Sequence, residues 1–186
     1  MRSPSAEYTD PAKRAFEERL QTFVGQEAER PVTGRDPVNK AFIRAWCDAI
    51  GDQNPIYTDA DFARNSIHGG IVAPPTMIQA WFFPAVGTTR PEPGTRIAEL
   101  IAILRTAGFT SVVATNFEHE YIRYVRPGDV LTLHQVIGSI SAEKRTSLGP
   151  GHFVNTIGSV RDQTGVVVCS IKYRRVFFRP EPEAQK

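Results

Sequence analysis

The sequence predicts an α+β fold in which helices come first and an antiparallel sheet then wraps around one long buried helix. Two observations predict this order. Apolar residues recur at helical spacing early in the chain, as in Phe16, Leu20 and Phe23. From Ser111 onward, β-branched and aromatic residues dominate, which is typical of strands. The segment Thr76–Phe83 is apolar on nearly every side, so it is the helix expected to lie buried against the sheet.

Each expected helix begins at a capping residue or a proline and ends at a glycine or a turn. The expected helices are Pro11–Phe23, Val38–Ile50, Asp59–Arg64, Thr76–Phe83 and Ile97–Ala107. Asp10 before Pro11 is expected to cap the first helix, Asp36 before Pro37 the second, and Asp59 the short third one. Gly51 is expected to end the second helix. The stretch 25–36 between these helices is rich in turn-forming residues and is expected to be a connector.

The second half of the chain is expected to form two antiparallel strand pairs. Residues 111–125 and 130–140 make the first pair, around a turn at 126–129. Residues 145–161 and 166–178 make the second pair. The apolar helix would then pack on one face of the resulting sheet.

The composition restricts the class of protein. The chain has 186 residues, 41% of them hydrophobic, and a net charge of +2, which fits a globular protein and argues against nucleic-acid binding. No membrane span and no secretory signal are expected, and the cysteines and histidines lack the spacing of metal ligands. We expect a cytoplasmic protein with a tail and helix (1–35), a main domain (36–178) and a linker-like tail (179–186).

Several motifs, taken in order, resemble a known family. Asp52-Gln53-Asn54-Pro55-Ile56-Tyr57-Thr58-Asp59 precedes a glycine pair, then Ala73-Pro74-Pro75 before the buried helix, then Tyr124-Val125-Arg126-Pro127-Gly128-Asp129. This order resembles the MaoC-like (R)-specific enoyl-CoA hydratases and dehydratases, over about residues 36–178. The resemblance implies the hotdog fold, with an N-terminal helical extension.

A narrower resemblance is to the MaoC-like subunit of actinobacterial heteromeric steroid side-chain enoyl-CoA hydratases. The matching segments are Asn54–Tyr57, His68–Gly70, Met77–Gln79, Ala107–Phe109 and Thr146–Phe153. The resemblance implies a second, smaller hotdog chain as the partner, in a heterodimer or heterotetramer. It also implies an acyl-CoA ligand and, through a further C-terminal domain, an aldolase or thiolase partner. No separate cofactor is implied, because the CoA thioester is the substrate.

Hydration of a trans-2-enoyl thioester needs a base for the attacking water, an acid for C2 and a donor to the thioester oxygen. Complete family members use the Asp of the D-x-N-P turn, a His two residues after its Pro, and an N–H of a His-Gly pair. Here Asp52 keeps its position, but Tyr57 replaces the histidine and Pro74-Pro75 replaces the His-Gly pair. A tyrosine titrates near ~10 and a proline has no N–H, so we expect no complete catalytic centre in this chain.

Simpler roles compete for the same residues. Asp52 also suits a turn or helix cap, Tyr57 a packed ring and His68 an ordinary loop histidine. An alternative acid–base pair would combine Asp52 with Tyr57 or His68. The residues expected to line a substrate pocket are Asn54, Tyr57, His68, Gly69 and Gly70.

A basic run in the last expected strand has two interpretations. Lys172, Arg174 and Arg175 either contact the phosphates of CoA or form a solvated face of the sheet.

We therefore expect a hydro-lyase subunit, inactive without its partner, that helps to add water to a bulky, steroid-type trans-2-enoyl-CoA. The partner would supply the complete Asp/His centre, and sheet edges would pair across the interface. Three alternatives remain, since hotdog folds support several functions. They are half of a 3-hydroxyacyl carrier-protein dehydratase of fatty-acid elongation, a non-catalytic acyl-CoA-binding scaffold, and a self-sufficient homodimeric thioesterase.

Overall fold

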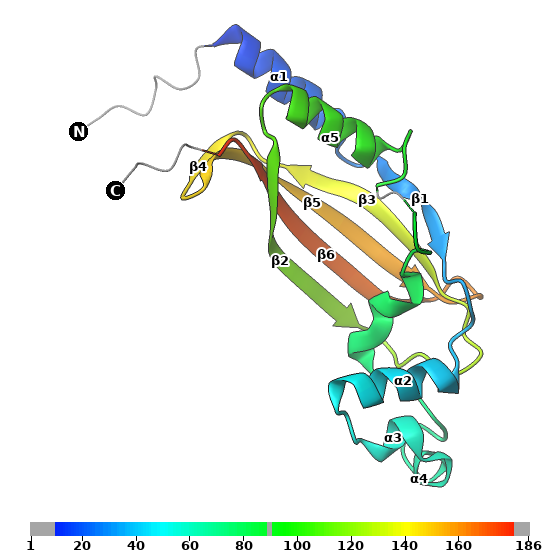
Figure 1. Cartoon of the computed structure of the whole chain (residues 1–186). Helices are drawn as coiled ribbons and strands as arrows, with labels where there is room; N and C mark the ends of the chain where they lie inside the picture. Colours follow the sequence, from blue (N-terminus) through cyan, green and yellow to red (C-terminus); the bar gives the residue numbers. More distant parts are fainter. Residues whose placement is uncertain (1–9, 89–90, 181–186) are drawn as a thin grey trace, which may run out of the picture.

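The computed structural model describes residues 10–88 and 91–180, which form an antiparallel six-stranded sheet with helices on one face (Figure 1). The strands lie in the order β1 (Glu27–Thr33), β3 (Thr132–Ile140), β5 (Gly149–Arg161), β6 (Val167–Phe178) and β2 (Ser111–Tyr121), and the short β4 (Lys144–Thr146) pairs with β5. The helices are α1 (Pro11–Gln21), α2 (Lys40–Ile50), α3 (Pro55–Thr58), α4 (Ala60–Arg64), the 3₁₀ helix η1 (Pro75–Phe82) and α5 (Arg96–Thr106). The predicted α+β class is confirmed. The tails expected at both ends fall largely on residues 1–9 and 181–186, outside the described part.

The expected connector at residues 25–36 is wrong, because it contains strand β1. This strand forms the edge of the sheet beside β3, and among its residues only Ala28 is fully buried. An edge strand exposed in this way shows no clear alternation of apolar residues, and it tolerates Pro31. Its hydrogen-bond partner lies about a hundred residues away in the chain, so no local signal announces it.

The first expected strand pair is also wrong. β2 pairs with β6 and β3 pairs with β5, so the strands on either side of the turn at 126–129 are not neighbours. The second expected pair, β5 with β6, is confirmed.

Helix α2 begins later than expected, with Asn39 rather than Asp36 as its cap. The Asn39 side chain accepts a hydrogen bond from the Phe42 N–H at 2.9 Å. Val38 exchanges backbone hydrogen bonds of 2.8 Å with Gly128 and Asp129, which holds it outside the helix and delays the start of α2. The caps predicted at Asp10 and Asp59 and the end predicted at Gly51 are confirmed.

The apolar segment expected to be a long helix is the eight-residue 3₁₀ helix η1. Met77, Ile78, Ala80 and Trp81 are buried, as predicted. Phe83 precedes Pro84, which disfavours helical geometry, and its backbone is extended with φ −60° and ψ 127°. The central helix therefore stops short.

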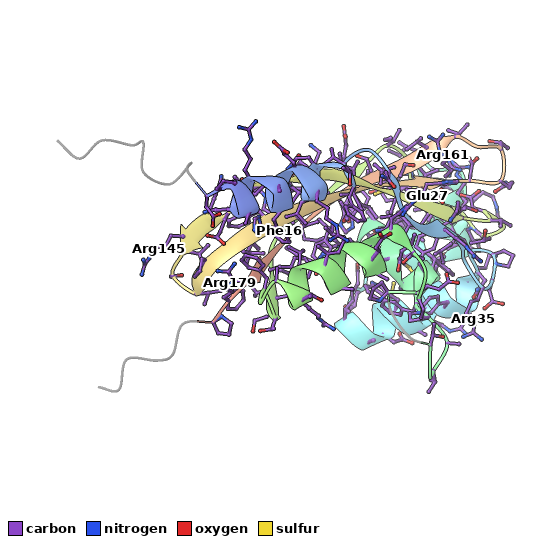
Figure 2. All side chains as sticks on the ribbon, turned by 90° about the horizontal axis from the view of Figure 1, so that it is seen from above. Phe16, Glu27, Arg35, Arg145, Arg161 and Arg179 are labelled. Carbon is purple, nitrogen blue, oxygen red and sulfur yellow. The ribbon has the colours of Figure 1, made fainter. Side chains whose placement is uncertain are left out.

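Two apolar clusters fill the space between the helices and the sheet. One lies under η1 and α2 and includes Met77, Ile171 and Cys169. The other lies under α1 and α5 and includes Leu104 and Phe177. Figure 2 shows α1 and α5 running alongside each other, with Phe16 between them.

Candidate functional site

The turn that begins the expected site uses its polar side chains for local structure. The Asp52 carboxylate accepts a hydrogen bond from the Asn54 N–H at 3.0 Å. The Asn54 side chain in turn accepts from the Ile56 N–H at 3.3 Å and caps α3. Pro55 at the first position of α3 needs no such partner. Asp52 and Asn54 therefore both have the turn-forming role that competes with a catalytic one.

Tyr57 points from α3 into the apolar cluster under η1 and is buried. Burial, the neighbouring Tyr124 and Asp52, and a hydrogen bond with Tyr124 together raise the pKa of its hydroxyl to about 12. A phenol with this pKa stays protonated at neutral pH. Tyr57 can therefore donate a hydrogen bond, but it cannot accept a proton from water as a histidine would.

His68 lies in the loop after α4 and joins the same group through Tyr124. Its ring centre is 4.6 Å from that of Tyr124, with the ring planes tilted by 60°. The His68 N–H donates to the Ser66 hydroxyl at 3.1 Å, which fixes the loop. Gly69 follows with φ +65°, a conformation that a side chain would strain. Gly70 has open space where a side chain would project.

Tyr124 is the residue that sequence reasoning missed. It contacts both Tyr57 and His68, yet it stands far from both in the sequence. It lies in the link between β2 and β3, within the segment 124–129 that resembles the hydratases. No sequence spacing in that segment indicates that Tyr124 contacts residues 57 and 68.

Ion pairs hold the link that carries Tyr124. The Arg123 guanidinium bonds the Asp129 carboxylate at 2.8 Å and the Asp162 carboxylate at 2.6 Å. Hydrogen bonds from the Thr164 hydroxyl and from Arg123 hold the pKa of Asp162 well below its usual range. Arg123 thus fastens the link to the turn between β5 and β6.

The position at the start of η1 that carries the oxyanion donor in the hydratases has no N–H in this chain. Pro75 is its first residue, and no side chain caps the helix. The preceding Ala73 N–H donates to the Val125 carbonyl at 2.9 Å, so it is already used. The structure thus connects Tyr57 and His68 through Tyr124 and places the charge of Asp52 near Tyr57, without a histidine at position 57 and without an N–H at position 75.

The basic run of β6 is divided between the two faces of the sheet. Lys172 and Arg174 face outward, and the Arg174 Nε donates to the Asn155 side chain at 3.0 Å. Arg175 points to the opposite, helix-bearing face, against the rings of Tyr173 and Phe177. The three residues therefore do not form one phosphate-binding surface.

The rest of the described structure offers few groups that could form another functional site. The described residues contain no group of three or more His, Cys, Asp and Glu side chains placed to hold a metal ion. Among the same residues, no helix is long and apolar enough to cross a membrane. A cavity of about 520 Å³ lies between α1 and the turn at Glu143, lined mainly by charged side chains that include the ion pair of Lys13 with Glu143 at 3.1 Å.

Comparisons with known proteins identify the family of this chain. The model of the family "FAS1-like, dehydratase domain region" matches residues 22–171. A "probable enoyl-CoA hydratase alpha subunit" of Thermomonospora curvata is 43% identical, over 91% of this chain and 54% of that protein. The "3-oxo-4,17-pregnadiene-20-carboxyl-CoA hydratase alpha subunit" of Mycobacterium tuberculosis is 40% identical, over 81% and 48%. The chain thus spans about half the length of these curated relatives.

Solved structures support the fold. A chain of the ChsH1–ChsH2 complex from Mycobacterium tuberculosis superposes with a TM-score of 0.83 at 35% identity, covering 92% of this chain and 95% of that one. The (R)-hydratase of A. caviae, at 13% identity and a TM-score of 0.55, shares the fold. The predicted hotdog architecture and the predicted resemblance are both confirmed. The chain belongs to the FAS1-like dehydratase-region family of MaoC-like hotdog domains.

Proposed function

We propose that this chain is the alpha-type subunit of a heteromeric enoyl-CoA hydratase, and that a second hotdog chain supplies the catalytic base and the oxyanion donor. The incomplete site carries this proposal. Asp52 is engaged in a turn, Tyr57 has a pKa of about 12, and Pro75 has no N–H at the start of η1. Relatives with names of hydratase alpha subunits support the assignment.

The edge strand β2 is the proposed contact with that partner. β2 lies at the opposite edge of the sheet from β1 and pairs only with β6 among the described residues. Large apolar side chains are exposed along it and just after it: Val112, Val113, Phe117, Tyr121 and Ile122. An open apolar edge favours pairing with another strand, which would continue the sheet across the interface.

The acyl part of the proposed enoyl-CoA substrate is bulky. Phe117 and Tyr121 are exposed on the helix-bearing face of the sheet. A second acyl chain need not bind at the incomplete site of this chain. The space that it would occupy is then free for a ligand larger than a simple acyl chain. The relative named for a pregnadiene carboxyl-CoA supports a steroid ring system as that body. The expected aldolase or thiolase partner and the cytoplasmic location stay predictions.

A second candidate is half of an acyl carrier-protein dehydratase. The description of the matching family, which refers to a dehydratase region, favours it. In that case the complete enzyme would require a carrier-protein thioester and would be slow with the CoA thioester.

The test combines the full chain with its candidate hotdog partner. Hydration of a steroid enoyl-CoA is followed for each chain alone and for the mixture, together with the mass in solution. We expect hydration only from the mixture, because a positioned base alone contributes roughly 10²- to 10⁴-fold to rate. Full activity from this chain alone would contradict the proposal. A mixture that acts on the carrier-protein thioester only would select the second candidate.

A further inference from the structure

Arg175 is half-buried on the helix-bearing face of the sheet, unlike its exposed neighbour Arg174. In β6 it pairs with Ala114 of β2 and Val154 of β5. Val154 belongs to the cluster under α1 and α5, so Arg175 shares the helix-bearing face. The carbon at the centre of its guanidinium is 5.1 Å from the centre of the Tyr173 ring and 5.8 Å from that of Phe177.

One nitrogen of the Arg175 guanidinium has no hydrogen-bond partner in the described part of the chain. Its Nε is buried and has no hydrogen-bond acceptor, and none of the ion pairs formed by described residues involves it. Burial lowers its pKa, while Tyr173 and Glu29 act in the opposite direction. A buried donor without a hydrogen-bond partner is costly, so this Nε is a candidate donor to a bound acceptor.

A second unsatisfied nitrogen lies on the same face, on the neighbouring strand β2. The Nε2 of His119 is buried without a partner, while its Nδ1 lies 3.2 Å from the Tyr121 hydroxyl. Burial lowers the pKa of His119, which favours the neutral ring. When the Tyr121 hydroxyl donates to Nδ1, Nε2 carries the proton and is a donor.

Two aromatic rings separate these nitrogens. The ring centre of Phe117 is 4.5 Å from that of His119 and 5.2 Å from that of Tyr173, which in turn contacts Arg175. From His119 to Arg175 the sheet therefore presents an aromatic surface with an unused donor at each end. Phe117 is 45% exposed, so this surface opens at the edge of the sheet proposed to meet the partner.

Resting on the proposed function, we infer that Arg175 is a specificity-determining residue that donates a hydrogen bond to a carbonyl oxygen of the bound acyl-CoA. The flat acyl body lies on the rings of Phe117 and Tyr173. Rings of this kind bind large apolar ligands well. An apolar body also excludes water, which strengthens the hydrogen bond from the guanidinium. The oxygen is either a keto group of the acyl body or a carbonyl of the thioester and pantetheine, and the experiment separates the two.

The experiment uses the complex of the full chain with its hydratase partner. Two polycyclic enoyl-CoA substrates are compared that differ only in a keto group on the rings. Arg175→Met removes the donor but keeps the length of the side chain. We expect kcat/KM for the keto substrate to fall about ten- to hundredfold, the usual effect of losing a hydrogen bond from a charged group. Arg175→Lys should restore part of this loss.

The second substrate identifies the oxygen. If the acceptor is the keto group, the keto-free substrate is unaffected by Arg175→Met. If the acceptor belongs to the thioester or pantetheine, both substrates lose rate equally while the complex stays assembled. Arg174→Met is the matched control, because Arg174 is adjacent in sequence but faces outward.

Three results would contradict either the role of Arg175 or the proposed function. Rates within twofold of the wild type for both substrates in Arg175→Met would overturn the inference. So would a loss explained by dissociation of the complex, measured as mass in solution. A wild-type complex that does not hydrate either substrate contradicts the proposed function instead.

Discussion

Replacing Phe117 by aspartate is expected to weaken association with the partner hydratase chain by about thirtyfold or more. Phe117 is 45% exposed in the middle of the edge strand β2, among the apolar side chains proposed to meet the partner. An aromatic residue at the centre of an interface typically contributes about 2 kcal/mol or more, which corresponds to roughly thirtyfold in Kd. A carboxylate there would also be buried without a partner.

The measurement is the Kd for association of the two purified chains. Substrate is left out, so that a change in acyl-CoA binding by Phe117 does not affect the measured Kd. Phe62→Asp is the matched control, because Phe62 is 52% exposed but lies on α4, away from β2. It should leave the Kd unchanged. Equal effects of the two substitutions, or none from Phe117→Asp, would rule out β2 as the interface.

Replacing Gly151 by alanine is expected to lower the free energy of unfolding by about 3 kcal/mol. Gly151 lies where β5 pairs with both β4 and β6. A Cβ there would meet the Phe177 carbonyl oxygen at 2.6 Å and the Phe178 Cβ at 2.9 Å. These atoms belong to the neighbouring strand and cannot move without separating it from β5.

Gly138→Ala is the control for Gly151→Ala. Its Cβ would meet Cδ1 and Cγ1 of Ile157 at 2.7 and 2.8 Å, in an exposed side chain that can change rotamer, so we expect a loss of about 1 kcal/mol. Thermal unfolding of each variant measures the difference, and about 3 kcal/mol corresponds to roughly 6–12 °C for a domain of this size. Equal midpoints for the two variants would contradict the packing described for β5 and β6.

Elements with local signals could be predicted from the sequence. Asp10, Asp59 and Gly51 act within a few residues of their own position, as caps and stops do, and the structure confirms all three. Features set by distant partners could not be predicted. Strand β1 depends on β3, and the delayed start of α2 depends on the hydrogen bonds of Val38 with Gly128 and Asp129.

The site shows the same division. The chemistry of Tyr57 and Pro75 follows from the residue types, so their inability to act as base and as donor could be predicted from the sequence. The position of Tyr124 between Tyr57 and His68 requires the tertiary fold. The separation of Arg175 from Lys172 and Arg174 depends on strand alternation, and its unsatisfied Nε depends on packing by elements far away in the sequence.

The most direct test of the proposal that a partner performs the chemistry is the initial hydration rate of the complex with Asp52→Asn in this chain. The Asn side chain keeps an oxygen that can accept from the Asn54 N–H, so the turn should survive. We predict a kcat within about twofold of the wild type, since loss of a catalytic base typically costs roughly 10²- to 10⁴-fold. A hundredfold fall with unchanged thermal stability would place the base in this chain and contradict the account.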